Sequence, residues 1–264
     1  MDPDVTNFDP MLFLLTLALA EPRILSMFIA IPIFNQSLLP TALRIPVAAV
    51  FGLLVVPVLM PALAAYPPGG WQLLGLIVKE SFIGFVLGFM IAMPFWLVES
   101  VGFFIDNQRG ASIAATLNPL TGNDSSPLGE MFNQAFIVWF FISGGFILML
   151  GVLYQSFQQW SVLAWTPHFS PDAVDVWLGQ LEALVRLGLL LGAPAIIAMS
   201  LAEIGLALMS SFVPSLDVFF LAMPIKSALA FLVLLLYFAT LFGYAAEHIE
   251  ALRGTVPFLD RQFR

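Results

Sequence analysis

The residues most able to do chemistry lie where a long apolar stretch of this chain gives way to a polar segment. Glu99, Gly102 and Asp106 follow one another at spacings of three and four, so on a helix they share one face. Two carboxylates on one face, next to apolar sequence, are compatible with a proton relay or a metal site. Because no histidine lies nearby to complete such a site, we favour a helix end near water with Arg109 as partner.

The polar segment continues beyond Arg109 and could not lie in hydrocarbon, because its backbone would leave hydrogen-bonding groups unpaired. Irregular backbone at such a place survives where it is buried in protein or lines a water-filled path. Small residues allow tight packing in a narrow space, and glycines and prolines supply turns. The residues concerned are Gly110, Ala111, Ser112, Ile113, Ala114, Ala115, Thr116, Leu117, Asn118 and Pro119, with Gln108 before them and Gly122, Pro127 and Gly129 after them.

Glu203 is the most isolated acidic residue, since it stands between two apolar runs. An intramembrane carboxylate is a functional hypothesis by default. Arg186 lies too far along the sequence to pair with it on one helix, so a partner must come from elsewhere. We favour structural pairing, within the chain or between subunits, over transport chemistry. A broken region at 214–226, with Asp217, Met223 and Lys226, offers further candidates for contacts between subunits or for gating.

Signals of an enzyme or of a bound cofactor are weak. Ser143 is followed by two glycines, as around an intramembrane serine nucleophile, but it sits inside an uninterrupted apolar helix without an adjacent base. His168 and His248 have no metal-like neighbour, the chain has no cysteine, and no phosphate-binding loop is present. We therefore expect neither enzymatic activity nor a metal or cofactor.

Composition decides the class of protein. The chain is 60% hydrophobic and 10% charged, with a mean hydropathy of +0.97, whereas soluble domains are about half apolar and a quarter charged. We expect an all-α integral membrane protein, because helices satisfy their own backbone in lipid. The net charge of −8 is spread thinly, without the basic face that nucleic acid requires.

Hydropathy predicts about six membrane spans. The clear apolar runs are 81–98, 135–153 and 227–246. The run at 45–66 is long enough to span, but Pro46, Pro57 and Pro61 should kink or split it. The remaining runs are shorter, and each is cut by a charged residue. The charged residues are Glu21, Arg23, Arg186 and Glu203.

Several of these segments are expected to be hairpins that pack on other subunits, because neighbouring protein can satisfy charges and proline breaks. Gly84 and Gly88 stand four apart in an apolar run, a spacing that favours close packing of another helix. We expect one membrane domain over residues 1–264, with a plug-like loop at about 106–129 and the second broken region at 214–226.

Residues 99–112, followed by Asn118-Pro119, resemble the signature of the SctT/FliR family, the export-gate subunit of bacterial type III secretion systems and flagella. Residues 106–110 with 126–129 look closer to the virulence-type injectisome branch than to the flagellar one, and Asn118 departs from the acid of the flagellar pattern. The resemblance covers nearly the whole chain, through Arg23, Pro32, Pro40, Arg44, Lys79, Glu80, Gly84, Gly88, Pro214, Asp217, Val218, Phe219, Pro224, Ile225 and Lys226.

The resemblance implies a non-enzymatic subunit that joins two smaller partner types in a helical, ring-like gate in the bacterial inner membrane. Unfolded proteins would pass through this gate, and the segment after Gly110 would plug it. Glu99, Asp106, Gln108 and Arg109 would anchor the plug. The switch protein and the large export-gate protein of the same system are further expected partners, beside membrane lipid.

Orientation and the main alternative rest on charged residues. An acidic N-terminus and a basic tail predict a periplasmic N-terminus and a cytoplasmic C-terminus. The alternative function is an ion-coupled transporter of small molecules that uses Glu203 and Asp106 for coupling.

Overall fold

The computed structural model describes residues 9–35, 39–110, 126–165, 173–212, 218–251 and 254–262. Within these ranges the chain is helical and contains no strand, which confirms the all-α prediction. The chain divides into two compact units. Unit 1 comprises Met1–Ala92, Gly144–Ala173 and Ala251–Arg264, and unit 2 comprises Met93–Ser143 and Val174–Glu250.

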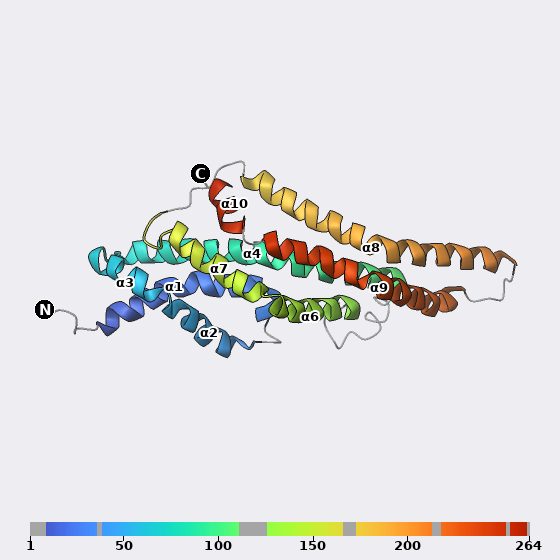
Figure 1. The fold of residues 1–264 in the computed structure, drawn as a ribbon, viewed down its shortest axis with the longest axis horizontal. Helices are drawn as coiled ribbons and strands as arrows, with labels where there is room; N and C mark the ends of the chain where they lie inside the picture. Colours follow the sequence, from blue (N-terminus) through green and yellow to red (C-terminus); the bar gives the residue numbers. More distant parts are fainter. Residues whose placement is uncertain are drawn as a thin grey trace. The chain divides into compact units, whose positions relative to one another are not determined.

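Unit 1 is built from short helices around the first part of a long one (Figure 1). Its first helix starts where the Asp9 carboxylate caps the N–H groups of Met11, at 2.9 Å, and Leu12, at 3.2 Å. A buried cluster that includes Leu19, Leu63 and Leu76 forms part of its core. Its elements are α1 (Pro10–Ala30), η1 (Pro32–Phe34), α2 (Thr41–Leu53), α3 (Val56–Ala65), the beginning of α4 (Gly70–Arg109), α7 (Gly145–Gln159) and α10 (Thr255–Gln262).

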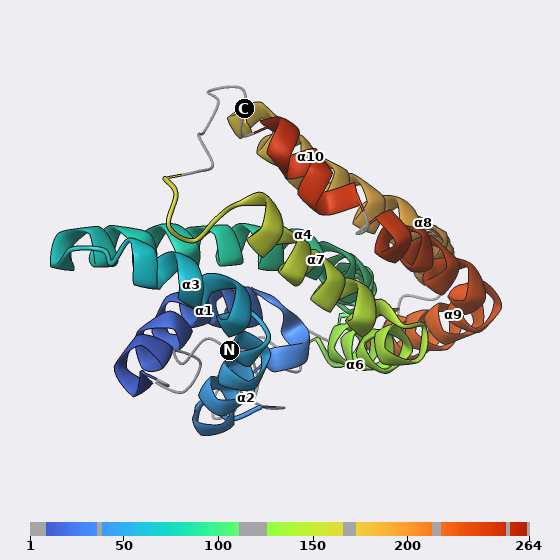
Figure 2. The same cartoon turned by 60° about the vertical axis from the view of Figure 1, so that its left-hand side comes forward.

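Unit 2 contains the rest of α4 with α6 (Pro127–Ile142), α8 (Ala173–Phe212) and α9 (Val218–Ala251). Aromatic rings hold α4 to α6, since the ring centre of Phe95 lies 4.8 Å from that of Phe136 and 5.1 Å from that of Phe140. The helices α8 and α9 run next to each other as a hairpin in both views (Figures 1 and 2).

Four of the described helices are long and apolar enough to cross a membrane, and six spans result if each of two bent helix pairs is counted as one. The expected number of about six is compatible with this count. The most apolar windows of α8 and α9 are only 28% and 22% buried. Apolar surface on this scale belongs in lipid or against protein, and the chain is a membrane protein.

Two of the charged residues that cut apolar runs of the sequence lie inside continuous helices. Arg23 lies inside the continuous helix α1, and Glu203 lies inside the continuous helix α8. Arg23 is fully buried and Glu203 has a lysine partner, so each charge is satisfied without interrupting the backbone. These charged residues interrupt apolar runs of the sequence without breaking the helices.

The breaks between helices lie only partly where the sequence predicts them. The run with three prolines does split, into α2 and α3, which are bent by 75°. The helix expected to run uninterrupted through Ser143 is instead broken into α6 and α7, also bent by 75°. Gly144 adopts a left-handed conformation there, with φ at 81°, which glycine accepts without strain.

The second broken region is smaller than predicted. From Val218 onward the chain is helical, and Pro224 lies inside α9. One proline removes a single backbone hydrogen bond, and neighbouring groups in a membrane protein can compensate for it. Asp217 and the rest of 213–217 lie outside the described residues.

Candidate functional site

Glu99, Gly102 and Asp106 lie on the face of α4 that packs against α6. Glu99 Oε2 accepts a hydrogen bond from Asn133 Nδ2 at 3.0 Å. A Cβ atom on Gly102 would lie 2.5 Å from backbone atoms of Gly129, so the two helices meet there without a side chain between them. The shared face thus contacts a helix, and the described part of the chain holds no group of three His, Cys, Asp or Glu side chains suited to a metal ion.

The carboxylate of Asp106 joins the end of α4 to the beginning of α6. Its Oδ2 accepts hydrogen bonds from the Ser126 hydroxyl at 2.7 Å and from the backbone N–H of Leu128 at 2.9 Å. Its Oδ1 lies 2.6 Å from a guanidinium nitrogen of Arg109, one turn later on α4. The expected Arg109 partner is present, but the expected position near water is wrong, because the Asp106 side chain is only 4% exposed. Burial strengthens these bonds.

Local sequence defines both borders of the segment between α4 and α6. Ser126 caps α6 by accepting a hydrogen bond from the Gly129 N–H at 3.0 Å, and Pro127 fills the first helical position. At the other border, Gly110 follows α4 in a left-handed conformation with φ at 83°. The candidate plug residues after Gly110 lie outside the described residues. They are Ala111, Ser112, Ile113, Ala114, Ala115, Thr116, Leu117, Asn118 and Pro119.

Two further residues at the end of α4 reach the α8–α9 hairpin. Gln108 Nε2 donates a hydrogen bond to the Ser200 hydroxyl of α8 at 3.1 Å. The Arg109 guanidinium carbon lies 5.7 Å from the ring centre of Phe231 on α9, which is within cation–π range. The last turn of α4 therefore contacts α6, α8 and α9.

Sequence reasoning did not identify three of these partners. Ser126 carries a local signal, because a serine before a proline is typical of a helix start. Asn133 and Ser200 carry none, since their partners come from another helix and no local pattern distinguishes them from solvent-facing polar residues.

Glu203 finds its partner across the α8–α9 hairpin. Its Oε2 lies 3.2 Å from Nζ of Lys226, and the side chains are 50% and 10% exposed, respectively. The structural pairing that we favoured is thus present within the chain. Met223 stands one turn before Lys226 on α9 and is half-buried.

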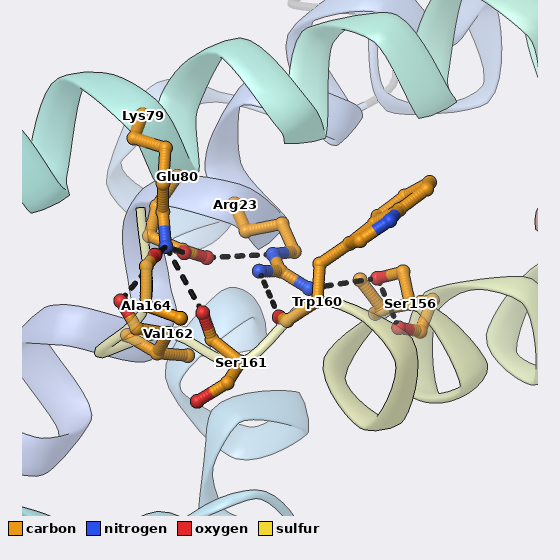
Figure 3. A network of polar contacts seen from close by, with 9 residues as sticks. Arg23, Lys79, Glu80, Ser156, Trp160, Ser161, Val162 and Ala164 are labelled. Carbon is orange, nitrogen blue, oxygen red and sulfur yellow. Dashed lines mark hydrogen bonds and ion pairs between the residues drawn. The ribbon is translucent and has the colours of Figure 1, made fainter. Parts of the chain in front are cut away.

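A second polar network lies in unit 1 (Figure 3). Arg23 of α1 and Glu80 of α4 are both fully buried, and Arg23 Nε lies 2.6 Å from Glu80 Oε2. The other guanidinium nitrogens donate to the Ser156 hydroxyl at 3.1 Å and to the Trp160 carbonyl at 3.0 Å. A buried charge pair is tolerated when all its polar atoms are engaged, and here it joins α1, α4 and the end of α7.

Lys79 extends this network beyond α7. Its Nζ lies 2.9 Å from Glu80 Oε1 and donates to the carbonyl oxygens of Ser161, Val162 and Ala164 (Figure 3). Adjacent residues on a helix do not normally face each other. Lys79 and Glu80 nevertheless meet, and each has a further partner, since Lys79 binds the segment that follows α7 and Glu80 binds Arg23 of α1.

Gly84 and Gly88 allow α1 and α4 to approach closely enough for the Arg23–Glu80 pair. A Cβ atom on Gly84 would overlap the carbonyl group of Arg23, and one on Gly88 would lie 2.6 Å from the carbonyl oxygen of Met27. Small residues at this spacing are typical of close helix contacts in membrane proteins.

Comparison with known proteins places these features in a family. Residues 14–252 match the family described as "Bacterial export proteins, family 1". The chain is 40% identical to the Yop proteins translocation protein T of Yersinia pestis, over 93% of this chain and 94% of that protein. This chain belongs to that family of bacterial export proteins. The SctT/FliR resemblance is thereby confirmed.

Other relatives show the breadth of this export family. The secretion system apparatus protein SsaT of Salmonella typhimurium is 34% identical, over 89% of this chain and 90% of its own length. The flagellar biosynthetic protein FliR of Bacillus subtilis is 27% identical, over 83% of this chain and 85% of its own length. The chain is a subunit of a type III export apparatus and not an enzyme, and the comparisons lend no support to a small-molecule transporter.

Proposed function

We propose that this subunit forms and seals part of the channel through which unfolded proteins cross the bacterial inner membrane. The segment from Gly110 to Pro119, continuing to Pro127, acts as the plug. The two smaller membrane subunits of the same export gate surround the chain, and its switch and large export-gate proteins contact the assembly. The N-terminus faces the periplasm and the C-terminus faces the cytoplasm, in keeping with the acidic start and basic tail.

The observation that carries the plug assignment is the anchoring of both its borders by one buried carboxylate. Asp106 precedes the segment, and Ser126 and Leu128 follow it, with hydrogen bonds of 2.7 and 2.9 Å between them. A polar segment whose two ends are held together is restricted to a small region, as a plug requires. Glu99, Gln108 and Arg109 support this anchor through Asn133, Ser200 and Asp106.

The proposed channel also explains how a polar segment is compatible with apolar helices. Irregular backbone is tolerated at membrane depth where protein or a water-filled path surrounds it. Such a path is what an export channel provides. The pairing of Glu203 with Lys226 and the position of Met223 give the α8–α9 hairpin polar and adaptable groups for contacts with neighbouring subunits or for gating.

Ion conductance of the assembled gate tests the plug. In gates purified with their partner subunits and inserted into planar bilayers, residues 112–124 are replaced by a glycine–serine linker of the same length. Gly110 and Ser126 are kept, so that both helix borders remain intact. We expect a higher resting conductance, because the linker cannot pack as the native small residues do.

The matched control replaces residues 167–171, which lie before α8, by a linker in the same way. It should leave the resting conductance at the native level. Native conductance in the 112–124 replacement would refute the plug assignment, and equal leak in both variants would point to general damage of the gate.

Co-purification tests the partners. The native chain, extracted from its own membrane, should be recovered as a large hetero-oligomer with the smaller export-gate subunits. Recovery as a monodisperse single subunit would contradict the proposed assembly.

A further inference from the structure

The ammonium group of Lys79 is enclosed by four oxygen atoms. Three are backbone carbonyl oxygens, from Ser161 at 3.0 Å, Val162 at 2.8 Å and Ala164 at 2.7 Å. The fourth is Glu80 Oε1 at 2.9 Å. An ammonium has three N–H groups, so its full donor capacity can be used here.

These three carbonyl groups lie just after the end of α7, whose C-cap is Trp160. The last carbonyls of a helix have no partner within it, and a cation near them is favourable. Arg23 Nη2 binds the carbonyl of Trp160, the residue that ends α7, and Lys79 binds the carbonyls that follow. One buried carboxylate, that of Glu80, forms an ion pair with both cations.

The same segment also positions the helix near the end of the chain. The indole N–H of Trp160 donates to Asp260 Oδ1 of α10 at 3.3 Å, and Val256 and Leu259 of α10 are 1% exposed. The backbone carbonyl of Trp160 is thus bound by Arg23 of α1, while its side chain binds α10. A shift of Trp160 would therefore move a side chain that binds α10.

We propose that Lys79 is a positioning residue that fixes residues 161–164, which directly follow the α10-binding Trp160, against α4 through both its charge and its N–H donors. An ammonium donates directional hydrogen bonds to carbonyl oxygens, whereas a tetraalkylated ammonium has no N–H group to donate. This role does not depend on the plug, because all the groups involved belong to unit 1.

Cysteine labelling measures the position of this segment. The chain has no cysteine of its own, so Val162→Cys, at a position 3% exposed, introduces a single buried thiol. The full chain in detergent is labelled with N-ethylmaleimide, with and without Lys79→Ala. We expect Lys79→Ala to raise the labelling rate about tenfold or more, because three charge-assisted hydrogen bonds are lost.

Added cations test whether the N–H donors matter. Ethylammonium fits the space left by the lysine side chain and carries three N–H groups, so it should return the labelling rate of Lys79→Ala toward the native value. Tetramethylammonium carries the same charge without N–H groups and should have no effect. Val152→Cys on α7, also 3% exposed, is the matched control whose rate should not change.

Three outcomes would overturn the proposal. The first is an unchanged rate at position 162, and the second is an equal rise at positions 152 and 162, which indicates global loosening. The third is a rise that ethylammonium does not reverse, or that tetramethylammonium reverses equally. If Lys79→Ala does not accumulate, Lys79→Met keeps the apolar stem and should still raise the rate at position 162.

Discussion

The backbone N–H of Leu128 donates a 2.9 Å hydrogen bond to Asp106 Oδ2, so the second residue of α6 is bound by a side chain of α4. The N–H groups in the first turn of a helix have no partner within it, and a carboxylate is their best acceptor. The interaction joins elements on either side of the segment 111–125. Its strength determines how firmly the two borders of that segment are held.

Asp106→Asn should lower the melting temperature of the detergent-solubilised chain. The amide still offers one acceptor oxygen, but the partly buried guanidinium of Arg109 loses its negative partner. Breaking such a pair by removing one member costs about 3–5 kcal/mol when it is fully buried, and Arg109 is 16% exposed, so we expect about 2–3 kcal/mol. Asn107→Ala, on the exposed side of the same turn, is the control and should shift stability by less than about 0.5 kcal/mol.

Gly102→Ala should destabilise unit 2, although alanine is the better helix former. The added Cβ would lie 2.5 Å from backbone atoms of Gly129, which cannot move aside as a flexible side chain would. Overpacking of this kind costs about 1–3 kcal/mol. Gly205→Ala in α8 has open space around it and should stabilise by up to about 1 kcal/mol. If both substitutions shift the melting temperature in the same direction, the close contact at Gly102 is contradicted.

Gly144→Ala should weaken the bend between α6 and α7. Nothing lies within 4 Å of a Cβ atom there, so any loss comes from the left-handed backbone, with φ at 81°. That conformation costs about 1–2 kcal/mol for a residue with a Cβ atom. Gly151→Ala, in the helical backbone of α7 and equally uncrowded, should instead be neutral or stabilising. A melting temperature unchanged by Gly144→Ala would show that the bend is not held by this glycine.

Glu203→Gln should cost more stability than Lys226→Met. Lys226 is 10% exposed, and removal of its acidic partner leaves a largely buried ammonium without a negative charge. Glu203 is 50% exposed and can be hydrated when its lysine is lost. The double variant completes a mutant cycle, in which half-exposed pairs typically couple by about 1 kcal/mol or less. If Lys226→Met lowers the melting temperature more than Glu203→Gln does, this asymmetry is contradicted.

The local parts of the site could be predicted from the sequence. The spacing of Glu99, Gly102 and Asp106 defines one helix face because α-helical periodicity is independent of the rest of the fold. The split between α2 and α3 follows from proline chemistry in the same way. The aspartate-to-arginine pair at positions 106 and 109 joins two neighbours on one turn of α4 and is equally local.

The tertiary parts could not be predicted. Arg23 and Glu80 are separated by 57 residues, and Gln108 and Ser200 by 92, so no pattern along the chain pairs them. The same limit applies to the charges within apolar runs, since the buried partner that makes Arg23 tolerable lies on another helix. The bend at Gly144 was missed because apolar residues surround it and glycine is common in membrane helices.

Unit 1 is assembled from three separate stretches of the chain, and this affects the order in which it is synthesised. Unit 1 takes its residues from Met1–Ala92, Gly144–Ala173 and Ala251–Arg264, with both stretches of unit 2 between them. During translation, α1 to α3 emerge early, but α7 and then α10 follow only after α6 and after the α8–α9 hairpin, respectively. The hydrogen bond from Trp160 to Asp260 can therefore form only after the whole α8–α9 hairpin has been synthesised. The unit that the ribosome begins first is the one that it completes last.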